Sequence, residues 1–157
     1  MVRRLLPTVL ALLVLLSTAT PARAQVGPGV HVARMSDVGG GAYGVGGSLR
    51  LGLPLAPVDV FLAGDYFFPD CGPGDCSLWG GSADVHFTMG LPVLTPYGTV
   101  GVVYRSYSVS DVTADATGFG LGAGIDLGTL GLGAYLEGRY EFVDPDDQFV
   151  FRLGIRF

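Results

Sequence analysis

The chain has 157 residues, no lysine and a formal charge of −5, and 49% of its residues are hydrophobic. An acidic chain without a basic cluster cannot hold a phosphate backbone, which excludes nucleic acid as a partner. Its 26 glycines far exceed average usage, yet there is no G-X-Y repeat and apolar residues abound, which excludes both collagen and disorder.

The first 24 residues have the layout of a secretory signal peptide. Two arginines precede an apolar run over 5–16, and a stretch of small residues ends at Ala24 in an A-x-A cleavage pattern. The run is shorter than the ~20 apolar residues that a membrane-spanning helix needs. We therefore expect cleavage between Ala24 and Gln25, export from the cytoplasm, and a single mature domain over 25–157.

The rest of the chain shows a period of two, broken by turn residues, which is typical of β-strands. Eight strands are predicted, over 29–35, 42–53, 58–68, 77–89, 96–108, 117–127, 131–142 and 149–157. Apolar side chains alternate with glycine, serine or charged side chains. In the fifth strand we place Val100, Val102 and Tyr104 on the apolar face, which turns Arg105 the other way; a bulge would reverse part of this strand.

The connections between the predicted strands are of two alternating kinds. Those after the second, fourth and sixth strands are compact and uncharged. The other four carry aspartates: Asp37, Asp70, Asp75, Asp111, Asp115, Asp144, Asp146 and Asp147. The polar loop after the fifth strand is expected over 111–116. The connections at one end of the sheet are therefore acidic and those at the other end are uncharged. Both termini of the mature chain are expected at the uncharged end.

The last strand alternates up to its final residue. Its apolar face consists of Phe149, Phe151, Leu153, Ile155 and Phe157. A strand of this kind that ends on phenylalanine resembles the closing strand of bacterial outer-membrane β-barrels, in which it is the signal read by the barrel-assembly machinery. The strand number, the alternation of turns and loops, and the aromatic residues near strand ends also resemble this family, of the OmpA transmembrane domain and OmpX type.

Period two alone also fits a lipocalin-like or sandwich fold with the apolar face inside. The less apolar face is mainly glycine, serine and charge, which suits a narrow lumen better than a soluble surface, and a sheet in lipid must close. The resemblance implies an all-β, eight-stranded antiparallel up-and-down transmembrane barrel in the outer membrane of a Gram-negative bacterium. It implies as partners outer-membrane lipid and lipopolysaccharide, the assembly machinery and periplasmic chaperones. We expect a monomer.

Charged side chains lie on the inward faces of the predicted strands. The network expected there consists of Arg50, Asp84, Glu137, Arg139, Glu141 and Arg152. Charges in a low-dielectric interior must be paired or are costly. The network lines an ion path or fills a closed lumen. An eight-stranded barrel has a narrow interior, which favours the hypothesis that these side chains fill the lumen over the hypothesis of an ion path.

Three further features bear on chemistry. Cys71 and Cys76 flank a Gly-Pro-Gly turn in an exported chain, so we expect a disulfide rather than a metal site or free thiols. His86-Phe87-Thr88 is the nearest match to the His-x-Ser element of lipid A deacylases, but it has threonine in place of serine and its histidine points inward. His31 has no partner at metal-ligand spacing.

The predicted function is structural or surface-interacting, without catalytic activity, cofactor or metal. A narrow ion or small-solute channel is the alternative, and a lipid A-modifying enzyme a more remote one.

Overall fold

The computed structural model describes residues 26–36, 41–53, 58–72, 76–89, 94–109, 112–129 and 132–157. The predicted signal peptide over 1–24 and its cleavage point at Ala24 and Gln25 lie outside these ranges. Within them, no helix is long and apolar enough to cross a membrane.

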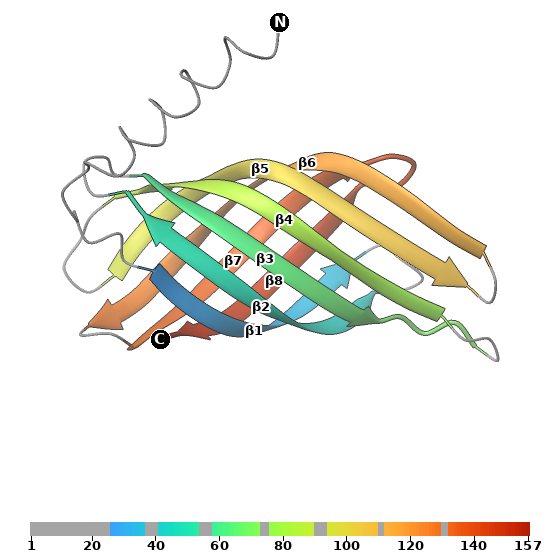
Figure 1. Ribbon diagram of the computed structural model, residues 1–157, viewed down its shortest axis with the longest axis horizontal. Helices are drawn as coiled ribbons and strands as arrows, with labels where there is room; N and C mark the ends of the chain where they lie inside the picture. The colour runs from blue at the N-terminus through green and yellow to red at the C-terminus, as the bar shows by residue number, and fades with distance from the viewer. Residues whose placement is uncertain are drawn as a thin grey trace, which may run out of the picture.

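Eight antiparallel strands form one closed barrel in which each strand pairs with its neighbours in sequence and β1 pairs with β8 (Figure 1). The strands are β1 Val26–Ser36, β2 Ala42–Gly52, β3 Val58–Phe68, β4 Cys76–Thr88, β5 Leu94–Val109, β6 Val112–Thr129, β7 Leu132–Val143 and β8 Gln148–Arg156. Closure leaves the sheet without an unpaired edge. The predicted all-β, eight-stranded up-and-down barrel is confirmed.

The β5–β6 hairpin is longer than predicted. The polar loop expected over 111–116 is wrong for most of its length, because β6 begins at Val112 and pairs with the end of β5. The hydroxyls of Ser108 and Thr113 lie 2.9 Å apart across this extension. The prediction ended the strand where its apolar alternation ended. Backbone hydrogen bonding needs only a partner strand. A strand can therefore continue through polar residues even where both of its faces are exposed.

Apolar side chains cover the outside of the barrel, and the inward faces are mostly buried. In β5, Val100 and Val102 face outward, whereas Val103 and Arg105 are buried inside. The register of β5 is continuous from Tyr97 to Val109 with β4 and from Leu94 to Val109 with β6, which confirms the face chosen for this strand.

Aromatic side chains surround the outside near the loop end. Trp79 and Tyr104 contact each other with ring centroids 5.4 Å apart, and Phe119 stacks on Phe142 at 4.5 Å. Aromatic residues at this height are typical of the interfacial girdle of membrane barrels. We call this ring the aromatic belt.

Inside the barrel, glycines lie opposite the largest inward side chains. A Cβ atom on Gly120 would overlap the guanidinium of Arg139, and one on Gly46 would overlap the ring of His31. The interior therefore has room for long side chains because the glycines opposite them have no side chain. This interlocking accounts for much of the high glycine content.

A disulfide joins Cys71, in the connection after β3, to Cys76, the first residue of β4, with Cα atoms 6.2 Å apart. The bond closes a short loop, so it restricts the unfolded chain only modestly.

We expect the unreduced protein purified from membranes to be two hydrogens lighter than the reduced protein in intact-mass measurements. Replacing both cysteines by serine should lower the free energy of unfolding by about 2 kcal/mol or less, because the closed loop is short. Free thiols in the unreduced protein would contradict the disulfide.

Candidate functional site in the barrel lumen

The lumen is filled near its loop end by a cluster of buried apolar side chains. Its members are Ala33, Met35, Ala42, Phe67, Leu78 and Val150, with Tyr107 packed against them. Met35, Phe67 and Val150 have no exposed surface. We call this cluster the apolar plug. Sequence reasoning missed it, although the inward positions of Phe67 and Val150 followed from the alternation.

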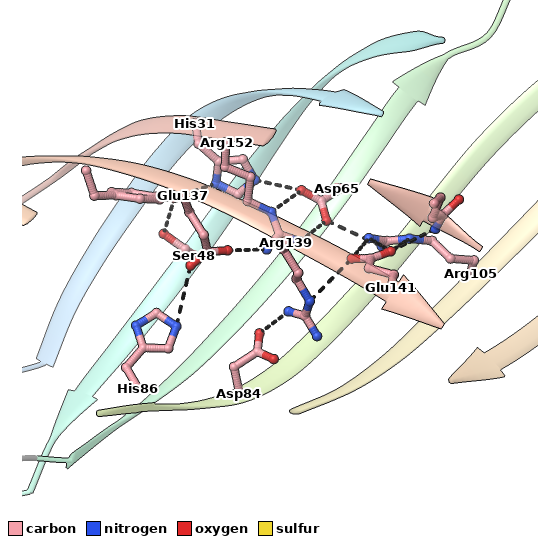
Figure 2. A network of polar contacts seen from close by, with 12 residues as sticks. His31, Ser48, Asp65, Asp84, His86, Arg105, Glu137, Arg139, Glu141 and Arg152 are labelled. Atoms are coloured by element: carbon pink, nitrogen blue, oxygen red, sulfur yellow. Dashed lines mark hydrogen bonds and ion pairs between the residues drawn. The ribbon is translucent and has the colours of Figure 1, made fainter. Parts of the chain in front are cut away.

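Charged side chains from five strands lie beside the apolar plug and extend from it towards the turn end; Figure 2 draws them with their neighbours. They are Asp65 of β3, Asp84 of β4, Arg105 of β5, Glu137, Arg139 and Glu141 of β7, and Arg152 of β8. None of the seven is more than 4% exposed. We call this set the ion-pair layer.

Arg152 joins two walls of the barrel. Its Nη1 donates to Oε1 of Glu137 on the adjacent strand at 2.9 Å, and its Nη2 donates to Oδ2 of Asp65 across the lumen at 2.7 Å. The other oxygen of Asp65 lies 2.7 Å from Nε2 of His31, whose Nδ1 lies 3.0 Å from the hydroxyl of Tyr135. A carboxylate from β3 is thereby held by side chains from β8 and β1.

The other two arginines of the layer meet the remaining carboxylates. Arg105 donates to Glu141 through one edge of its guanidinium, with Nη2 2.6 and 2.8 Å from the two carboxylate oxygens and Nε 3.1 Å from one of them. Gln148 also donates to Glu141, at 2.7 Å. Arg139 donates to Asp84 at 2.5 Å. Charge-assisted, forked pairs of this kind are the strongest hydrogen bonds available to side chains.

A second charged cluster lies at the turn end of the lumen. Arg50 pairs with Asp59 and with Asp126, and Arg156 pairs with Asp126. Arg50 and Asp59 are partly exposed, whereas Asp126 and Arg156 are buried. Arg50, Asp59 and Arg156 border a hollow of about 400 Å³ that Val26 and Phe157 also line. We call the four charged residues the turn-end cluster.

The structure brings together five of the six residues predicted for the network, and Arg50 lies apart from them in the turn-end cluster. Asp65, Arg105 and His31 were not among the six. All three could be placed inward from the alternation. Which charges meet across the lumen depends on strand stagger and side-chain reach, which the alternation does not give.

His86 is buried in the lumen below the ion-pair layer. Its ring lies between Phe61 and Tyr97, with centroids 4.6 and 4.5 Å away, and its Nε2 is 3.6 Å from Oε2 of Glu137. Its neighbour on the same face, Asp84, pairs with Arg139 instead. In the described part of the chain, no three His, Cys, Asp or Glu side chains are grouped so that they could hold a metal ion.

The apolar residues of the last strand lie on the outer surface. They are Phe149, Phe151, Leu153, Ile155 and Phe157, and each is exposed. β8 also closes the barrel against β1, and the backbone N–H of Phe157 donates to the carbonyl of Pro28 at 2.9 Å.

The solved structures with a similar fold include three outer-membrane proteins. Neisserial surface protein A (NspA) is 16% identical, covering 83% of this chain and 94% of its own, with a TM-score of 0.64. The N-terminal β-barrel domain of Pseudomonas aeruginosa OprF is 18% identical, covering 83% and 96%, also at 0.64. The outer membrane enzyme PagL is 13% identical, covering 83% and 98%, at 0.53.

These similarities identify the fold as that of the small eight-stranded outer-membrane barrels. Because the sequence identities are this low, the similarities are evidence about the fold alone. No protein-family model matches the sequence, and no curated protein matches it.

Replacing Arg152 with alanine should lower the free energy of unfolding by about 3–5 kcal/mol, because it leaves Asp65 and Glu137 as buried charges without this partner. Urea unfolding in detergent micelles measures this. The matched control, Arg34 to alanine on the outer face, should cost much less. A loss of less than about 1 kcal/mol for the Arg152 variant, the size typical of exposed ion pairs, would contradict the network's contribution.

Proposed function

We propose that this chain is a bacterial outer-membrane β-barrel with a closed lumen and a structural or surface-interaction role. Two features support this proposal: the distribution of apolar side chains outside and charge inside, and the fold shared with outer-membrane barrels. The filling of the lumen by buried side chains is the observation that carries the functional part.

The outer wall supports placement in a membrane. Val102, Leu121 and Phe119 are each more than half exposed, and similar side chains surround the barrel. Soluble proteins rarely expose continuous apolar surface of this extent. In lipid the same surface is solvated, and the closed sheet satisfies its own backbone groups.

Two adjoining sets of buried side chains support a lumen that does not conduct. The apolar plug offers no charged group to a passing ion, and the ion-pair layer fills the lumen beside it and towards the turn end with side chains that pair with one another. An eight-stranded barrel has an interior just wide enough for side chains. An ion would have to separate several buried pairs to pass, and each leaves a costly unpaired charge.

In a planar bilayer, the wild-type protein should give no stable, discrete current steps, whereas a porin inserted in the same way should. This recording also tests the alternative, a narrow channel. Frequent openings from the wild type that change in size when Phe67 is replaced by alanine would contradict the closed lumen.

The lipid-modifying alternative has no observation in its favour within this site. Its candidate histidine, His86, faces the lumen between two aromatic rings, whereas Phe87 faces outward. A membrane lipid would meet the outer wall. We therefore propose no reaction.

We further propose that the last strand is the signal for assembly. Deleting Phe157 should lower the amount of barrel in the outer membrane of cells, whereas refolding in detergent should still succeed because only one outward side chain is lost. Heat-modifiability on gels measures both. Phe119 to alanine, which removes another exposed aromatic, is the control and should assemble normally. Normal levels of the Phe157 deletion in cells would refute this role.

A further inference from the structure

One basic side chain faces outward from this barrel. Beyond the predicted signal peptide the chain has six arginines, two histidines and no lysine. Five of the arginines belong to the ion-pair layer or the turn-end cluster, and both histidines face the lumen. The sixth, Arg34, is exposed on the outer face of β1. Among the described residues it is therefore the single cation that the wall of the barrel can offer to a ligand.

Arg34 lies two residues before the end of β1, at the height of the aromatic belt. In the barrel register it stands between Tyr43 of β2 and Phe151 of β8. Its guanidinium carbon is 5.5 Å from the centroid of the Tyr43 ring. A guanidinium held by its face against a ring keeps its N–H edge for an anion. In the described ranges no carboxylate forms an ion pair with it.

An apolar groove runs along the wall from Arg34 towards the turn end. It consists of two adjoining hollows of about 430 and 650 Å³, which share Val32, Val45 and Leu153. Arg34, Tyr43 and Phe68 border the first hollow, and Val30, Ala134 and Ile155 border the second. From Arg34 to Val30 the groove extends about 13 Å, at ~3.3 Å per residue. We call it the β1 groove.

The position of the cation matches the depth at which a lipid has its charge. An arginine on the lipid face is costly at the middle of a bilayer and almost free at its interface. Here the cation lies at the interfacial height, with an apolar groove directly below it along the same strand. An anionic lipid has the matching arrangement, with a charged headgroup at the interface and an acyl chain directly below it.

We propose that Arg34 and the β1 groove form a binding site for one anionic lipid of the leaflet at the loop end. The phosphate of its headgroup lies on the guanidinium edge of Arg34, and an acyl chain lies in the groove. The connections at this end carry aspartates, including the exposed Asp144, Asp146 and Asp147, which repel anions. Anionic lipid is therefore held at Arg34 rather than around the whole rim. This site rests on the membrane placement proposed above.

The test reconstitutes the protein in phosphatidylcholine vesicles that contain a minor share of phosphatidylglycerol, and native mass spectrometry then identifies the lipid that remains bound after mild extraction. The wild type should retain phosphatidylglycerol in preference to phosphatidylcholine. Arg34→Gln should lower this preference about fivefold, the effect of losing one basic residue near a charged membrane surface. Arg34→Lys should keep most of it.

A second pair of variants tests the groove. Val32→Phe fills it and should also reduce retention, whereas Val102→Phe, on the opposite wall with similar exposure, should not. Equal retention by the wild type and Arg34→Gln would overturn the site while leaving the proposed barrel intact. Loss in Arg34→Gln with none in Val32→Phe would overturn the acyl-chain half of the proposal. Failure of the wild type to insert into vesicles would overturn the proposed function itself.

Discussion

The pairing of three buried arginines with four buried carboxylates is the interaction on which the rest of this structure depends. Charges inside a narrow barrel cannot keep their water, and a single unpaired one would cost several kcal/mol. Each arginine must therefore reach a carboxylate on another strand. That requirement explains the glycines opposite them, because the guanidinium of Arg139 occupies the space that a side chain on Gly120 would need. It also ties opposite walls together, as Arg152 of β8 does with Asp65 of β3.

The same pairing separates this barrel from a pore. Polar residues in a lumen suggest a path for ions when they are considered one at a time. Here each member of the ion-pair layer is paired with a side chain of opposite charge, although Nε and Nη2 of Arg139 and Oδ1 of Asp84 have no hydrogen-bond partner among the described residues. The apolar plug, with Met35, Phe67 and Val150 fully buried, fills the neighbouring part of the lumen towards the loop end. The outer wall has the reverse composition: in the part of the chain that the structure describes it is mainly apolar, with Arg34 as its one cation. Contacts between polar side chains therefore fill the lumen, and the apolar outer surface remains available to contact lipid.

Much of the fold could be predicted from the sequence. Strict alternation places each side chain inside or outside, so the outward face of β5 and the inward position of Arg105 followed without any knowledge of contacts. Alternation does not show where a strand ends once it leaves the apolar region, and the loop expected over 111–116 was wrong for that reason. It also cannot show which charges meet across the lumen. Arg50 and Arg152 are both inward arginines, yet they lie in different clusters, because strand stagger sets the height of each residue.

The central claim is that the lumen charges stabilise the barrel as pairs rather than singly. A double-mutant cycle on Arg139 and Asp84, with methionine and leucine as replacements, tests it most directly through the free energy of unfolding in micelles. The account predicts that each single variant is strongly destabilised, that the double variant recovers part of the loss, and that the coupling is at least about 1.5 kcal/mol. Losses that add to within about 0.5 kcal/mol, as they do for independent sites, would contradict it.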